Sequence, residues 1–170
     1  TNCELNNTEI EDLYLGSQDR IDYTSRAGIL ATSYSRGISV ENCRVINKSH
    51  IKSKGMTTAG IIGFAGDLNN IKDCSIEDSI VESGSEFNTG GNGTVAGIVG
   101  DILSSANPII DGCSVKNVNI SSSSDNIGGI IGTKGCNLSI NNSKVENVTM
   151  THTNGVTPKS SSNSRSIGTL

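Results

Sequence analysis

Apolar and polar positions alternate along this chain in a pattern that repeats every few tens of residues. Its clearest copies are three Gly-rich apolar segments, at residues 59–63 (AGIIG), 96–100 (AGIVG) and 128–132 (GGIIG). A weaker copy stands at residues 27–31, and residues 167–170 begin like a fifth. Such recurrence is typical of repeat architectures, in which each copy buries its apolar face by stacking on its neighbours.

A second marker of the repeat is a cysteine, replaced by serine in the last copy: Cys3, Cys43, Cys74, Cys113 and Ser143. The intervals are 40, 31, 39 and 30 residues, so long and short repeats alternate. Apolar residues stand three positions before and two positions after this marker, and in several copies also at five and seven after it. Spacing by two and a high β-branched content predict short strands.

Polar residues interrupt the apolar runs at two fixed positions. The position before the cysteine holds Asn2, Asn42, Asp73, Gly112 and Asn142. The position four after it holds Asn7, Asn47, Asp78, Asn117 and Asn147. Asn and Asp tolerate left-handed backbone, which predicts turns. In a parallel, in-register stack, equivalent residues lie roughly 4.8 Å apart, so we expect the cysteines and the second polar set to form two structural ladders.

These patterns predict an all-β fold, a right-handed parallel β-helix or β-solenoid of about five coils, its hand following the rule for parallel crossovers. Each coil would hold a strand through the Gly-rich segment, a bent strand through the cysteine and a third strand. The glycines would mark corners or close backbone approach. We expect residues 1–170 to form a single solenoid domain, a fragment of a longer chain.

The connections after the third strand alternate in length. Residues 11–26, 82–95 and 151–165 are long, whereas 52–58 and 121–127 are short, so one edge of the solenoid would carry long loops. The Gly-rich stretch 84–93 is predicted to be the most flexible of them. Helix is poorly supported, although 17–26 could hold a turn.

The Gly-Ile-Ile-Gly unit, followed after a polar turn by Ile-x-x-Cys-x-Val, resembles the GLUG repeat, named for its Gly-Leu-x-Gly core. Residues 60–63, 97–100 and 129–132 match that core with Ile for Leu, while 28–31 and 168–170 match in part. The family occurs in bacterial surface and secreted proteins, including adhesins and the amino-terminal regions of immunoglobulin-A-cleaving metallopeptidases. The resemblance implies a solenoid that is secreted or at the cell surface, and it brings no catalytic residues.

Composition and charge narrow the possible functions. The chain has no Trp, two Phe and three Tyr, so its core must be built from small and branched side chains. The net charge of -4 is spread along the chain without a basic stripe, which gives no support to nucleic-acid binding. No apolar run is long enough to cross a bilayer, so we expect no membrane insertion.

The cysteine ladder admits two interpretations. Stacked, parallel side chains place Cβ atoms too far apart for a good disulfide, which favours buried thiols that behave as small hydrophobes. Disulfides are the alternative. The spacings match no zinc motif, and Cys136 lies outside the ladder in a predicted turn, where exposure would make it the reactive thiol of the set.

Catalysis by carboxylates is the main alternative to a purely structural role, since parallel β-helices also serve as polysaccharide lyases and hydrolases. The candidate side chains are Glu77 with Asp78, Glu41 with Asp73 and Asp111, and the bases Lys72 and Lys116. A glycosidase needs two carboxylates at a set separation, and nothing in the pattern shows an aromatic-lined sugar cleft. His50 and His152, the only histidines, form no His-Glu-x-x-His motif and are interpreted as solvated strand-end residues.

We therefore predict a non-catalytic structural or adhesive module of a secreted or cell-surface bacterial protein, without cofactor or metal. It would act as a rigid spacer that presents loops to a host or matrix protein or a glycan, with neighbouring repeats of the chain as its other partners. The alternatives are part of a β-helical polysaccharide-degrading enzyme and the scaffold of a secreted protease. Buried core positions are expected at Ile62, Val99 and Ile131.

Overall fold

The computed structural model describes residues 1–11, 25–33, 37–53, 57–83, 94–103, 107–122, 126–153 and 166–168. All regular secondary structure in these residues is β-strand, and every strand pair is parallel. None of the described residues belongs to a helix long and apolar enough to cross a membrane.

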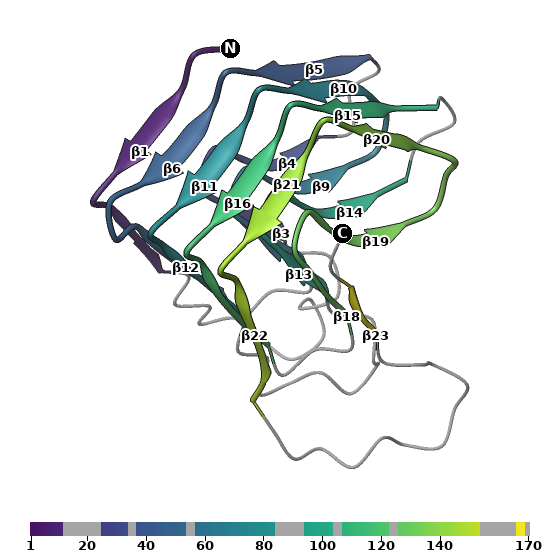
Figure 1. Cartoon of the computed structure of the whole chain (residues 1–170). Coiled ribbons are helices and arrows are strands. Elements are labelled where there is room, and N and C mark those ends of the chain that lie inside the picture. The colour runs from purple at the N-terminus through teal and green to yellow at the C-terminus, as the bar shows by residue number, and fades with distance from the viewer. Residues whose placement is uncertain are drawn as a thin grey trace, which may run out of the picture.

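The strands form five stacked sheets, which Figure 1 shows as rows of parallel arrows. Sheet A contains β1 (Glu4–Asn6), β6 (Arg44–Ile46), β11 (Ser75–Glu77), β16 (Ser114–Lys116) and β21 (Lys144–Glu146). Sheet B contains β2 (Glu9–Glu11), β7 (His50–Ser53), β12 (Ile80–Ser83), β17 (Asn119–Ser122) and β22 (Thr149–His152). Sheet C contains β3 (Ser25–Ala27), β8 (Thr57–Ala59), β13 (Thr94–Ala96), β18 (Asn126–Gly128) and β23 (Ser166–Gly168).

Two further sheets complete each turn of the chain. Sheet D contains β4 (Leu30–Ser33), β9 (Ile62–Ala65), β14 (Val99–Ile102) and β19 (Ile131–Lys134). Sheet E contains β5 (Ile38–Glu41), β10 (Leu68–Lys72), β15 (Ile109–Asp111) and β20 (Ser139–Asn141). One coil passes through sheets A, B, C, D and E in turn, and the next coil begins in sheet A.

The strand register confirms that one sequence repeat is one coil of a parallel β-solenoid. In sheet A, the apolar residue two after each cysteine pairs with its equivalent in the next coil, giving the column Leu5, Val45, Ile76, Val115 and Val145. Long and short repeats therefore occupy the same cross-section. The difference in their length is taken up in the connections between strands.

Each coil has more strands than the three predicted. The Gly-rich segment bends at Gly60 and Ile61, so that β8 ends just before them and β9 begins just after. The predicted cysteine strand likewise divides at Asp73 and Cys74 into β10 and β11. At Asp73 the backbone is left-handed, and at Gly60 it approaches the backbone of the next coil closely. The alternation of apolar residues in the sequence reveals neither feature.

The core is a column of branched aliphatic side chains inside the coils. Ile62, Val99 and their neighbours in the middle coils are fully buried, as predicted. Ile131, expected to be equally buried, is only half-buried because β19 is the edge strand of sheet D. Burial is thus a property of the stack and declines toward its ends.

The predicted long loops fall mostly outside the described residues. This applies to 12–24, 84–93 and 154–165, and therefore to the flexible stretch and to most of the segment 17–26 that could hold a turn. Of the short connections, residues 54–56 and 123–125 also lie outside the described part.

Candidate functional site

Two corners of every coil are formed by residues with left-handed backbone. Four of the five residues before the cysteine column are Asn or Asp with φ between 48° and 58°, and the fifth, Gly112, has φ of 63°. The residues of the second polar set have φ between 48° and 56°. The turn prediction is confirmed at both positions, because Asn, Asp and Gly are the residues that adopt this conformation at least cost.

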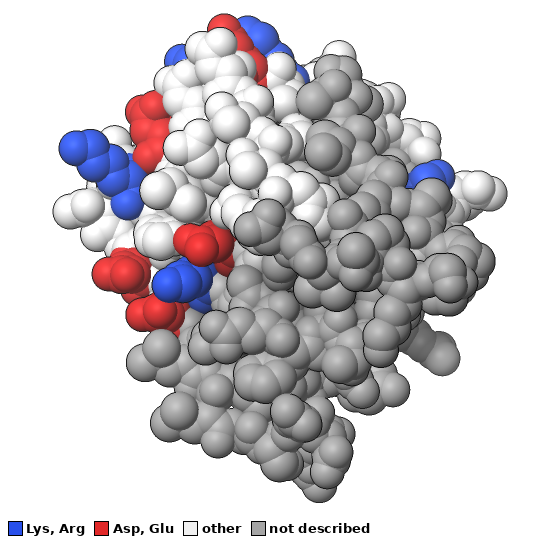
Figure 2. Space-filling view, turned by 90° about the horizontal axis from the view of Figure 1, so that it is seen from below, with Lys and Arg blue, Asp and Glu red and all other residues white. Residues whose placement is uncertain are grey.

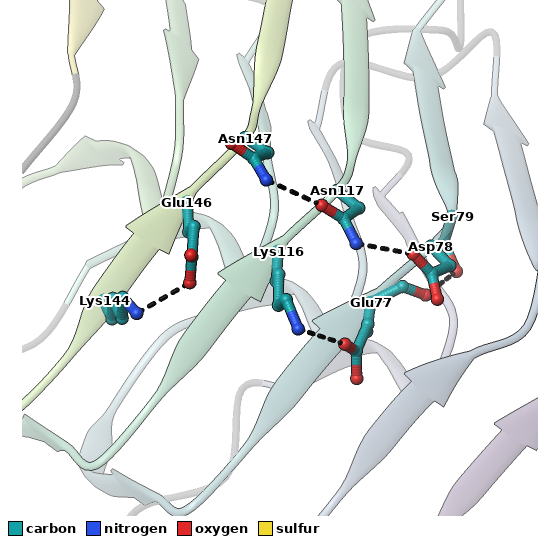
Figure 3. Close-up of polar contacts among 8 residues, drawn as sticks. All are labelled: Glu77, Asp78, Ser79, Lys116, Asn117, Lys144, Glu146 and Asn147. Atoms are coloured by element: carbon teal, nitrogen blue, oxygen red, sulfur yellow. Dashed lines mark hydrogen bonds and ion pairs between the residues drawn. The ribbon is translucent and has the colours of Figure 1, made fainter.

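The side chains of the second polar set form a ladder in the later coils. The Asn147 amide Nδ2 donates to Asn117 Oδ1 at 3.1 Å, and Asn117 Nδ2 donates to Asp78 Oδ1 at 2.8 Å (Figure 3). The Asn117 amide both accepts and donates, so the two bonds run in one direction along the solenoid. Asp78 can only accept when ionised, and it ends this run.

In the earlier coils the predicted ladder is wrong in detail. The Asn47 amide donates to Asn6 Oδ1 at 3.0 Å, so Asn6 replaces Asn7 as its partner. The cause is one additional residue in this corner: Lys48 is also left-handed, with φ of 62°, and its main-chain N–H bonds to the Asp78 carbonyl at 2.7 Å. The additional residue displaces Asn47 from the column formed by the equivalent residues of the other coils. Its distance in sequence from Cys43 is the same as in the other coils, so the sequence could not show this displacement.

The cysteine column is a column of free thiols. Cys43, Cys74 and Cys113 are buried and all five cysteines are free, whereas Cys3 is exposed, which corrects the expectation that it is buried. Each buried Sγ lies near the carbonyl oxygen two residues earlier, for example Cys74 Sγ at 3.3 Å from Lys72 O. Ser143 makes the equivalent hydrogen bond, with Oγ donating to Asn141 O at 2.8 Å.

The Cys74 thiol is chemically quiet. Contact with the Cys113 thiol, together with burial, raises the pKa of Cys74 above its ordinary value. A thiol that stays protonated is a poor nucleophile and a poor metal ligand. Cys136 lies outside the column, as predicted, and is half-buried against the core.

Outward-facing charges alternate in sign from coil to coil. Three columns defined by the strand register read Glu11–Lys52–Glu82, Glu41–Lys72–Asp111 and Glu77–Lys116–Glu146. Ion pairs join Glu11 to Lys52 at 3.4 Å and Glu77 to Lys116 at 3.1 Å, the latter drawn in Figure 3. In the view of Figure 2, acidic and basic side chains lie beside one another on the visible described surface.

Three of the carboxylates considered for catalysis, Glu77, Asp78 and Asp111, have structural partners. The Glu77 carboxylate raises the pKa of Lys116 through their ion pair, and Asp78 accepts a hydrogen bond within the ladder. Asp111 accepts a hydrogen bond from Asn142 Nδ2 at 2.9 Å. The main-chain N–H of Asp73 bonds to the Asp111 carbonyl at 3.0 Å, so these residues are neighbours through the backbone.

The histidines differ from the solvated strand-end residues that were expected. His50 opens β7, is half-buried, and places Nε2 3.2 Å from Glu82 Oε2. His152 ends β22 and is also half-buried, with its Nε2 atom buried and without a hydrogen-bond partner.

A polar hollow of about 370 Å³ lies beside the first of the two left-handed corners. It is lined by Asn2, Cys3, Glu4, Asn42, Arg44 and Asp73. Within it, Arg44 pairs with Glu4 at 2.9 Å. The sequence does not predict this hollow, because its lining residues come from the corners of three successive coils.

A second polar region lies where the outer faces of sheets C and D meet, at the glycine corner. We call it the C–D notch, and it consists of Thr57, Thr94 and Asn126 of sheet C, and Phe64, Asp101 and Thr133 of sheet D. Asn126 Nδ2 donates to Thr133 Oγ1 at 3.2 Å, which shows that the two columns face each other. No repeated pattern in the sequence indicates this region, because its three sheet D positions hold different residue types.

Glycine allows the two walls of the notch to come together. A Cβ atom on Gly132 would lie 3.0 Å from Thr94 Cβ, and one on Gly100 would lie 3.3 Å from the Thr58 carbonyl oxygen. The same Cβ atoms would lie 2.6 Å from the carbonyl oxygen of the equivalent glycine in the preceding coil, Gly63 or Gly100, so the second glycine of the repeated segment is required first by stacking within sheet D and then by the close approach of sheet C.

Within the described part of the chain, no group of three or more His, Cys, Asp or Glu side chains is placed to hold a metal ion. Comparison of the chain with protein-family models, curated proteins and solved structures gives no match.

Proposed function

We propose that this chain is a non-catalytic structural and adhesive module, a rigid spacer within a secreted or cell-surface bacterial protein. The observation that carries the proposal is the parallel strand pairing that joins each coil to the next, supported by contacts in the core and on the outer surface. Apolar columns fill the interior, while amide ladders and alternating ion pairs join successive coils on the outer surface. Bending such a rod would separate several of these contacts at once.

The charge pattern also supports a spacer. Ion pairs join adjacent coils at Glu4–Arg44, Glu11–Lys52 and Glu77–Lys116, so these charged side chains serve to hold the coils together. Contact with a host or matrix protein or a glycan is assigned to the long connections on one edge. The resemblance to GLUG repeats supports the bacterial surface location.

Binding of the intact chain to arrays of matrix proteins and glycans tests the adhesive part. A variant lacking residues 85–91 should keep its thermal stability, since loop length affects closure entropy only slowly, but should lose binding. A matched control is the surface variant Asn119→Ala, which should keep both properties. Equal binding by the deletion variant would contradict presentation by this loop.

Turnover tests the non-catalytic part. The chain should release no unsaturated or reducing-end products from acidic polysaccharides. Product formation that is abolished by Asp73→Asn or Asp111→Asn would overturn the proposal in favour of an enzyme.

A further inference from the structure

The C–D notch contains two buried oxygen atoms that have no hydrogen-bond partner, Thr94 Oγ1 and Asp101 Oδ1. Thr94 is only 2% exposed, and Asp101 is half-buried. A buried polar atom without a partner carries a desolvation cost, so each such atom calls for an explanation.

The two oxygen atoms belong to facing residues of one coil. Thr94 and Asp101 stand seven positions apart, as do Asn126 and Thr133, which are joined by a hydrogen bond across the corner in the next coil. Sheet C pairs Thr94 with Asn126, and sheet D pairs Asp101 with Thr133. The Thr94 side chain is directed at sheet D, since the Cβ position of Gly132 lies 3.0 Å from Thr94 Cβ.

The two groups could satisfy each other, because a hydroxyl donates to a carboxylate, yet neither reaches the other. Two buried oxygen atoms at facing positions of one corner are therefore left without a partner. Burial raises the pKa of Asp101, and a hydrogen bond from the Ile102 main-chain N–H offsets only part of that rise. The strand neighbours of Asp101, Phe64 and Thr133, bring no positive charge.

We propose that Asp101 and Thr94 bind a hard, oxygen-liganded cation in the C–D notch. Carboxylate and hydroxyl oxygens are the ligands that such ions prefer, and Ca²⁺ accepts irregular sets completed by water. With a single carboxylate the site would be weak, in the millimolar range of extracellular calcium modules. Asn126 and Thr133 hold the neighbouring coil in place beside it. This inference does not depend on the proposed spacer function.

Thermal unfolding of the whole chain in CaCl₂, from zero to 10 mM at constant ionic strength, tests the site. The melting temperature of the parent chain should rise saturably, by about 3 °C. Asp101→Asn and Thr94→Val preserve shape while removing a ligand, and each should abolish most of the rise. The control Glu77→Gln removes an exposed carboxylate from sheet A and should leave the rise unchanged.

Equilibrium dialysis with radioactive Ca²⁺ should show binding by the parent chain and by Glu77→Gln, and loss of binding in Asp101→Asn. No rise in melting temperature at 10 mM CaCl₂ would overturn the proposal. The same rise in Asp101→Asn as in the parent chain would also overturn it, because the ion would then bind elsewhere. If Asp101→Asn fails to fold, the response of Thr94→Val decides.

Discussion

The cysteine corner and the glycine corner change the direction of the chain for different physical reasons. At the cysteine corner, the residue before the thiol is left-handed, and four of the five copies are Asn or Asp. At the glycine corner, Gly60 and Gly97 are needed for space: a Cβ atom on either would collide with the carbonyl oxygen of the equivalent glycine in the next coil. The cysteine corner therefore requires a residue that tolerates left-handed backbone, and the glycine corner requires a residue without a side chain.

This difference predicts which substitutions each corner accepts. A left-handed position accepts most residues that are not β-branched at a moderate cost, because its side chain is exposed. A close-approach position accepts none larger than glycine unless two coils separate. Replacing a glycine should therefore lower the free energy of unfolding by different amounts at the two corners.

The largest effect is expected for Gly97→Ala at the glycine corner. Its new methyl group would press on the Gly129 carbonyl and lie 2.7 Å from Val115 Cγ2, and overpacking a rigid backbone contact should cost about 3 kcal/mol. The matched variant Gly112→Ala meets a left-handed φ and the movable Asp73 carboxylate, and should cost about 1 kcal/mol. Urea unfolding measures both, and equal costs would contradict the distinction between the corners.

A smaller effect is expected for Asn117→Ala at the second left-handed corner. The variant loses two ladder hydrogen bonds and places alanine at φ of 53°, at a combined cost of about 2 kcal/mol. Asn117→Gly removes the same hydrogen bonds but relieves the backbone, so it should cost about 1 kcal/mol less. Identical urea midpoints for the two variants would show that conformation is not the constraint here.

Cys113→Ser should cost less than about 1 kcal/mol, because a hydroxyl can donate to the carbonyl of Asp111 as Ser143 does to that of Asn141. Val115→Ser, two residues along the same chain segment and equally buried, has no such acceptor in its column and should cost about 3 kcal/mol. Thermal melting distinguishes the two. A larger loss for the cysteine variant would mean that the thiol column contributes more than packing.

The smallest effect is the pH dependence of Asp101. Burial raises the pKa of this carboxyl in the folded state above the ordinary value of 3.8, so the folded state binds the proton more tightly than the unfolded state. Its contribution to stability is therefore fully present below pH 3.8 and is lost as the pH rises through the folded pKa. Without added divalent ions, Asp101→Asn should lack this loss, so its stability relative to the parent chain should be greater at pH 7 than at pH 4 in urea unfolding. A constant difference between the two pH values would contradict this assignment.

The sequence was sufficient to predict the coil, its register and both left-handed corners, because each depends on a residue type that recurs at a fixed offset. It also placed Ile62 and Val99 in the core. It failed where one coil departs from the others. The additional left-handed residue Lys48 redirected Asn47, and the notch escaped notice because Thr94 and Asp101 are replaced by Asn126 and Thr133 one coil later.

Bends in the chain were underestimated for a related reason. A glycine inside an apolar run is compatible with a continuous strand, and only the proximity of the next coil's carbonyl makes it a corner. That proximity is a relation between two coils. A single repeat, read alone, therefore predicts its strands better than the angles between them.

The alternation of charge along the outer columns has a consequence for how such a molecule can grow. Removing a single coil would bring Glu11 against Glu82, or Glu77 against Glu146, and so turn attraction into repulsion. Removing or duplicating two adjacent coils would bring no like charges together in these columns, and it would also preserve the alternation of long and short repeats. The unit that can be gained or lost without charge repulsion is therefore a pair of adjacent coils. Related solenoids should differ in length by even numbers of coils.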